Sequence, residues 1–257
     1  MKKVFILFLL LSCELTFSQS KVHLQTFVGI EGGIMLAIPK IEDPGNQLIG
    51  KWTNNGSLGI MLKQEVFSNI FVSLGVFTQK YNNSFRFEND DATTSFKKVN
   101  LYRFPIKLAY EIPLHFGVPE LQIGLSVGTS YYMNQDAGLK ELKTGFIGSD
   151  IKNSYYLADS KYSDEKFAFL LEGGLYINVL MAKGTVLSFG ANYIYGLSNL
   201  HESSVRYKKG LGFEEINANI NGRGDQLNVW IGFQYPISKL WKKKEPRPEA
   251  GERIFFK

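Results

Sequence analysis

Val99 to Ile112 reads VNLYRFPIKLAYEI, and its side chains alternate strictly between two chemical kinds. The apolar and aromatic set comprises Tyr102, Phe104, Ile106, Leu108 and Tyr110. The intervening set contains Arg103, Lys107 and Glu111. Successive side chains of a strand point to opposite faces, so this pattern predicts a β-strand. Aromatic residues at both ends of the apolar face, opposite full charges, are typical of a strand that faces lipid on one side and a polar lumen on the other. A soluble barrel strand has the same period, so the remaining strands must decide between the two.

Seven further segments alternate in the same way. They cover residues 24–36, 56–64, 70–81, 121–133, 166–179, 185–195 and 226–237. The connections between the eight segments are alternately long and short. The long connections are residues 38–55, 82–96, 134–165 and 196–225, and the short ones are 64–69, 113–120 and 181–184. Short periplasmic turns and long extracellular loops are the pattern of an outer-membrane barrel. The sequence therefore predicts an all-β fold, an eight-stranded antiparallel up-and-down transmembrane β-barrel in the outer membrane.

Composition agrees with a barrel and excludes a nucleic-acid binder. Mean hydropathy is only −0.09, as expected where half of each strand faces inward. The chain has 29 basic and 24 acidic residues. Residues 1–18 contain two of the basic and one of the acidic residues, and residues 238–257 contain seven basic and three acidic residues. The body between them is left with equal numbers of each sign, whereas binding to nucleic acid requires a basic face.

The two ends of the chain have their own signals. Residues 1–18 predict a secretory signal peptide, with Lys2 and Lys3 before a short apolar run and a small-residue cleavage site at residues 16–18. Cys13 resembles a lipoprotein cleavage site, which leaves lipidation as an alternative, and as the sole cysteine it excludes a disulfide framework. The barrel domain is expected over residues 19–237. The basic tail, residues 238–257, is expected in the periplasm, either solvated or in contact with anionic lipid headgroups.

Several strand motifs resemble a known family. RFPIKLAYEI (103–112), KFAFLLEGGLYI (166–177), YIYGLSNL (193–200) and WIGFQYPI (230–237) are similar to strands of the PorT-like outer-membrane β-barrel proteins of Gram-negative bacteria. The resemblance covers residues 21–237 and implies the barrel fold and the outer membrane. The family name also implies one candidate role, a component of a protein-secretion system. A tail after the last strand is a departure, because outer-membrane proteins often end on an aromatic residue, here either Tyr235 or Phe256.

The inward positions of the predicted strands carry charges of both signs. They are Glu31, Lys63, Arg103, Lys107, Glu111 and Glu172. An eight-stranded barrel has an interior only wide enough to be filled by side chains. We therefore expect a packed lumen whose charges neutralise one another, and not a wide ion-selective pore.

The long connections contain aromatic residues among charges. The interaction candidates are Phe146, Tyr155, Tyr156, Tyr162, Tyr207 and Phe213. Such residues suit contact with a protein or a glycan, and the alternative is that they only pack the connections against one another. They favour a non-enzymatic binding or structural component of the envelope, without cofactor or metal, that contacts outer-membrane lipid through its wall.

Two other classes remain open. A lipid-modifying enzyme of the outer membrane could use His201 with Ser203 or Ser204. No pair of histidines has the spacing of metal ligands on a helix, so the sequence gives no sign of a metal enzyme. A soluble lipid-binding barrel would also alternate, but it would be released without detergent.

Overall fold

The computed structural model describes residues 24–37, 39–88, 90, 92–114, 120–147, 154–164, 167–210 and 212–237. The expected signal peptide with Cys13 and the expected basic tail lie outside these ranges, so both stay predictions. Among the described residues, no helix is long and apolar enough to cross a membrane.

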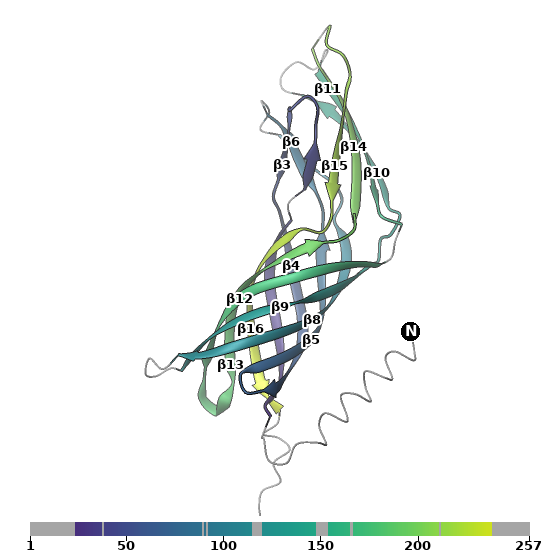
Figure 1. Ribbon diagram of the computed structural model, residues 1–257. Helices are drawn as coiled ribbons and strands as arrows, with labels where there is room; N and C mark the ends of the chain where they lie inside the picture. Colours follow the sequence, from purple (N-terminus) through teal and green to yellow (C-terminus); the bar gives the residue numbers. More distant parts are fainter. Residues whose placement is uncertain are drawn as a thin grey trace, which may run out of the picture.

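Eight long strands close into one barrel (Figure 1). They are β1 (Thr26–Ala37), β4 (Thr53–Phe67), β5 (Ile70–Tyr81), β8 (Val99–Leu114), β9 (Leu121–Asn134), β12 (Phe167–Leu180), β13 (Val186–Gly196) and β16 (Gln226–Pro236). Each pairs antiparallel with its neighbours in the order β1-β16-β13-β12-β9-β8-β5-β4, and β1 closes the barrel by pairing with both β16 and β4. The predicted fold is confirmed, with every strand boundary within about three residues of the expected one.

The long connections, which the sequence predicts as loops, contain eight short strands within the described residues. Five form one sheet, in the order β10 (Lys140–Phe146), β11 (Ser154–Tyr162), β14 (His201–Lys209), β15 (Ile216–Gly222) and β2 (Lys40–Glu42). Three form a second sheet, in the order β3 (Leu48–Lys51), β6 (Ser84–Phe87) and β7 (Thr93–Ser95). We call these two sheets the cap. It stands on one end of the barrel, away from the end where β1 begins and β16 ends (Figure 1).

The opposite end of the barrel has tight connections. A single 3-10 turn, η1 (Ala182–Gly184), joins β12 to β13, with Lys183 in the left-handed region at φ 62°. β4 and β5 are separated only by Ser68 and Asn69. Short turns of such barrels lie in the periplasm and long connections outside the cell, so we expect the cap to be extracellular.

The outer wall of the barrel is an apolar belt. On β8, Ile106, Leu108 and Tyr110 are each about half exposed, while Tyr102 and Phe104 face outward but are partly covered by neighbours. The wall also exposes Ile30, Ile34, Leu58, Ile60, Val76, Leu125, Val127, Leu175, Ile177, Val229 and Ile231. Toward the cap, Tyr131 stacks on Phe167 and contacts the rings of Phe104 and Phe169, forming part of an aromatic girdle.

Glycines on the inner face make room for the large side chains of the interior. A Cβ on Gly59 would lie 2.4 Å from the ring of Phe77, and one on Gly124 would lie 2.1 Å from the ring of Tyr176. Both rings approach charged groups, so these glycines allow aromatic side chains to enter the lumen beside the ions.

Candidate functional site

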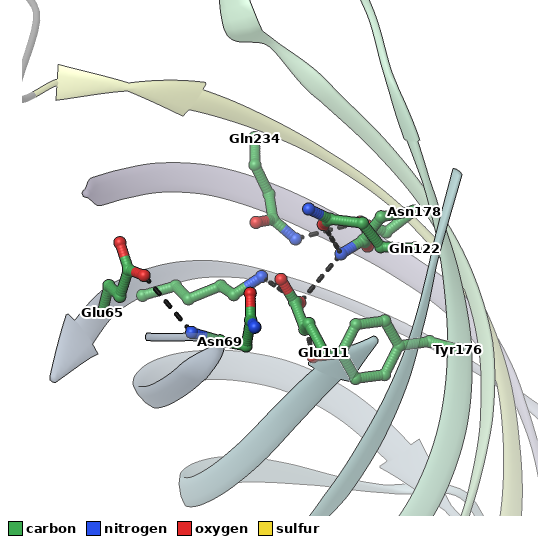
Figure 2. A network of polar contacts seen from close by, with 9 residues as sticks. Glu65, Asn69, Glu111, Gln122, Tyr176, Asn178 and Gln234 are labelled. Atoms are coloured by element: carbon green, nitrogen blue, oxygen red, sulfur yellow. Dashed lines mark hydrogen bonds and ion pairs between the residues drawn. The ribbon is translucent and has the colours of Figure 1, made fainter. Parts of the chain in front are cut away.

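The first polar cluster of the interior is centred on Glu111 of β8. Its Oε1 accepts hydrogen bonds from Tyr176 Oη at 2.7 Å and Asn178 Nδ2 at 2.8 Å, and it forms an ion pair with Lys63. Figure 2 shows Tyr176 and Asn178 converging on this carboxylate from β12. The chain of contacts continues from Asn178 Oδ1 to Ser188 Oγ (2.7 Å), which in turn accepts a bond from Gln234 Nε2 (3.0 Å). The cluster therefore links β4, β8, β12, β13 and β16 across the barrel.

Lys63 is enclosed by aromatic rings as well as by its carboxylate. Its Nζ lies 4.2 Å from the ring centre of Phe71, 5.6 Å from that of Phe27 and 5.8 Å from that of Tyr176. Ring faces attract a cation, so these three rings replace part of the hydration that the buried ammonium loses.

The second cluster is centred on Glu172 of β12, nearer to the cap. Arg103 NH1 is 2.9 Å from one carboxylate oxygen and Lys107 Nζ is 3.1 Å from the other. Ser130 also donates to this carboxylate, and Asn192 Nδ2 does so at 3.3 Å. The guanidinium of Arg103 lies 4.6 Å from the ring centre of Phe77. A fully buried arginine is thus paired by charge on one side and by a ring face on the other.

The structure brings all six predicted charges into the interior. The sixth, Glu31, is 97% buried, and together with Lys63 and Lys107 it lines a cavity of about 30 Å³ between the two clusters. Three carboxylates face three cations, so the interior is neutral overall. The cavity has room for little more than a water molecule and is no channel.

Other members of the clusters carry no charge and are not among the predicted site residues. Tyr176 and Asn178 have the same parity along β12 as Glu172, and this parity was the available signal. Period two places all three on the inner face.

Above the second cluster, apolar side chains fill the mouth of the barrel. This plug comprises Met35, Ala37, Tyr81, Val99, Leu101, Tyr132, Tyr162, Ala168, Leu170, Ile194 and Leu200, all nearly or fully buried. Most come from the cap-side ends of barrel strands, while Tyr162 comes from β11 of the cap. The cap is therefore continuous with the barrel interior through one hydrophobic cluster.

Three of the six predicted loop contacts pack inside the cap, in agreement with the alternative that they join the connections to one another. Tyr207 lies 5.3 Å from the ring of Phe87 and donates to Asp43 at 2.8 Å. Tyr156 packs at 5.5 Å on the same ring, and Tyr162 packs at 4.5 Å on the ring of His201. Each side chain points between the two sheets or into the plug because its partner strand fixes which face it occupies.

The other three predicted contacts face water. Exposed fractions are 56% for Phe146, 40% for Tyr155 and 65% for Phe213. Phe146 and Tyr155 are direct partners across β10 and β11, and Tyr155 donates to Glu215 at 3.4 Å, two residues beyond Phe213. We call these three residues the distal aromatic surface, because they lie at the far end of the cap from the barrel.

His201, the catalytic candidate, is fully buried at the base of the cap. Its Nδ1 is 2.8 Å from Asn83 Nδ2, and its Nε2 is 3.3 Å from Ser203 Oγ. The imidazole ring also contacts the rings of Phe96 and Tyr162. Burial lowers the pKa of His201 to about 4, although Glu141 opposes the shift. Ser204 points to the other face of β14 and is exposed. Among the described residues, no three His, Cys, Asp or Glu side chains are grouped to hold a metal ion.

These features define the class of protein. A closed eight-stranded sheet with an apolar outer belt satisfies every backbone group in lipid without an exposed edge. The protein is an outer-membrane β-barrel with a packed interior and a cap of two short-stranded sheets at one end.

Solved structures of similar fold include other outer-membrane proteins. Outer membrane protein OprG from Pseudomonas aeruginosa matches with a TM-score of 0.48 and 12% identity, over 82% of this chain and 96% of its own. Neisserial surface protein A matches with a TM-score of 0.41 and 8% identity, over 82% and 96%. The outer membrane protease OmpT from Escherichia coli matches with a TM-score of 0.34 and 11% identity, over 86% and 99%. These TM-scores and sequence identities are too low to indicate an activity. No protein-family model and no curated protein matches the sequence.

Proposed function

We propose that this protein is a non-enzymatic binding component of the cell envelope that contacts an extracellular protein or glycan through its cap. One observation carries the proposal, the folding of the long connections into a rigid pair of sheets that still leaves Phe146, Tyr155 and Phe213 in water. Large apolar side chains exposed on a rigid scaffold are a common feature of recognition surfaces.

The geometry of the interior supports a scaffold role for the barrel. Five of its six charges are in ion pairs, Glu31 is buried beside them, and its mouth is filled by the plug. The lumen therefore offers neither an open path nor an accessible reactive group. Recognition is then left to the exposed side chains of the cap, which are free of both lipid and packing.

The enzyme alternative has less support. His201 and Ser203 are buried between aromatic rings, and a lipid substrate has no route to them in this conformation. A PorT-like role in protein secretion is compatible with the fold, and it would be a special case of the binding function proposed here.

A triple substitution of the distal aromatic surface tests the proposal. Phe146→Ser, Tyr155→Ser and Phe213→Ser together should leave the barrel assembled and heat-resistant in detergent, but should fail to complement a strain that lacks the protein. A matched control replaces Asn217, Asn219 and Ser204, exposed on the same sheet, by alanine and should complement fully. Full complementation by the triple serine variant would refute the proposal. A change in the lipid A acyl pattern that depends on His201 would favour the enzyme instead.

A further inference from the structure

We propose that β10 is a docking edge, which takes an extended polypeptide segment as an added strand of the five-stranded cap sheet. This inference rests on the proposed function and names the class of its partner as a polypeptide. The inference rests on three observations about β10: which strand it pairs with, which of its backbone groups are hydrogen-bonded, and which of its side chains are exposed.

The cap has four edge strands, and β10 differs from the others. β2 and β7 have three residues each and β3 has four, whereas β10 has seven. β2 and β3 also lie beside each other, so these two edges cover one another in part. Among the described residues, β10 pairs only with β11, and its other edge has no hydrogen-bonded strand partner.

The hydrogen bonds to β11 show which backbone groups of β10 point to the open side. Tyr162 N–H donates to Leu139 O at 2.9 Å, and Ile147 N–H donates to Ser154 O at 3.2 Å. In an antiparallel pair, alternate residues bond to the partner, so the odd-numbered residues of this strand bond to β11. The N–H and C=O groups of the even-numbered residues therefore face the open edge. These residues are Lys140, Leu142, Thr144 and Phe146.

The same four residues carry exposed side chains on the solvent face of the sheet. Leu142 is 63% exposed, and Phe146 belongs to the distal aromatic surface. Natural edge strands are usually protected by charges or by a short length. On β10, Lys140 stands at the end nearest the barrel, and Lys143, whose side chain is 39% exposed, pairs with Glu141 at 2.8 Å. The side chains of Leu142, Thr144 and Phe146 on the solvent face carry no charge.

These features determine what kind of polypeptide segment fits the open edge of β10. Its backbone would pair with four N–H and four C=O groups of β10, as in other cases of strand addition. Apolar side chains at alternate positions would lie beside Leu142 and Phe146, and an acidic residue would lie beside Lys140. A polypeptide can satisfy this edge, whereas a glycan has no matching backbone period.

Amide hydrogen exchange provides the test, with the protein in lipid nanodiscs. The probe is a synthetic peptide of alternating valine and threonine with glutamate at both ends. At millimolar concentration it should slow exchange at the amides of Lys140, Leu142, Thr144 and Phe146 by about tenfold or more, because pairing shields them. A peptide N-methylated at alternate residues should have no effect. Unchanged exchange at these four amides with the first peptide would overturn the proposal. Protection that is present before the peptide is added and is lost on dilution would also overturn it, because the edge would then be paired with a second copy of the protein.

Thr144→Pro is the matched variant. Proline removes an N–H that points to the open edge and is tolerated at such positions, so the barrel and the β10–β11 pairing should remain intact. The variant should abolish protection by the peptide, whereas Ser204→Lys, in the same row of the sheet as Leu142, should not.

The two proposals can fail separately. If the triple serine variant fails to complement but Thr144→Pro complements and still shows peptide protection, the distal aromatic surface acts and the docking edge is wrong. If both variants complement fully, neither proposal stands.

Discussion

Inside the barrel, single side chains decide whether a buried charge is tolerated. Glu172 is shared by Arg103 and Lys107, and further donors saturate its oxygens. A buried ion pair adds little to stability compared with apolar residues of the same shape, but loss of one partner leaves an uncompensated charge. The clusters are therefore expected to enforce one arrangement of the barrel strands that carry these side chains.

The first prediction is that Glu172→Gln lowers the free energy of unfolding by about 3–5 kcal/mol, because Arg103 and Lys107 lose their shared carboxylate while buried. Urea unfolding in detergent micelles measures the change. Glu42→Gln is the control, since its ion pair with Lys40 is exposed and should leave the unfolding midpoint unchanged. A variant as stable as wild type would show that the cluster is not required.

The second prediction concerns pH. The pKa of His201 is about 4 in the folded cap, below the value of about 6.5 in an unfolded chain, so the unfolded state binds more protons between these values. Stability should therefore be constant above about pH 6.5 and fall by up to ~3 kcal/mol as pH drops to about 4. His201→Gln should remove this part of the dependence in urea unfolding measured across the pH range. A signal assigned to the His201 imidazole that titrates near pH 6.5 in the folded protein would contradict this prediction.

At the scale of the element, each barrel strand has two faces with opposite demands. β8 presents Ile106 and Leu108 to lipid and Arg103, Lys107 and Glu111 to the interior. The same alternation continues into the cap, where β10 and β11 present one face to the core and the other to water.

Ile106→Lys tests the outer face. An ammonium at mid-depth in the bilayer should cost about 2–4 kcal/mol and impair insertion. Leu142→Lys is a matched control, because Leu142 is an exposed leucine on a cap strand that faces water, and this variant should assemble normally. Yields of heat-modifiable, folded protein in the outer membrane compare the two. Equal yields would mean that Ile106 does not face lipid.

At the scale of the whole molecule, three layers follow one another from the periplasm outward. The ion clusters come first, then the apolar plug, then the core of the cap, which comprises Leu48, Phe85, Phe87, Phe96, Ile147, Ala158, Val205, Tyr207, Ala218 and Ile220. Because these layers are joined, the cap is held rigidly on the barrel and does not hang from it as separate loops.

The fourth prediction is that the purified protein shows no large, steady conductance in a planar lipid bilayer. The paired charges and the plug obstruct the lumen along its length. Single-channel recording is the measurement, and a general porin of larger diameter serves as the positive control. A stable nanosiemens pore would show that the interior rearranges in the membrane.

The barrel was predictable because its information is local. Period-two alternation along each strand and the alternation of long and short connections identify eight strands, their lipid faces and the six interior charges. Polar partners such as Ser130 and Asn192 follow from the same parity. Which charge pairs with which does not follow, because Glu172 meets Arg103 and Lys107 only through the closure and register of the barrel.

The cap depended on tertiary structure. Tyr155 and Tyr156 are neighbours with the same chemistry in a segment that reads as a loop, yet one is exposed and the other packs on Phe85 and Phe87. Their difference arises because β11 pairs with β10 and with β14, where their partners Lys208 and Tyr207 lie about fifty residues further along the chain. A short strand has too few residues for its pattern to show a face, so partners distant in sequence decide which side is core and which edge stays open.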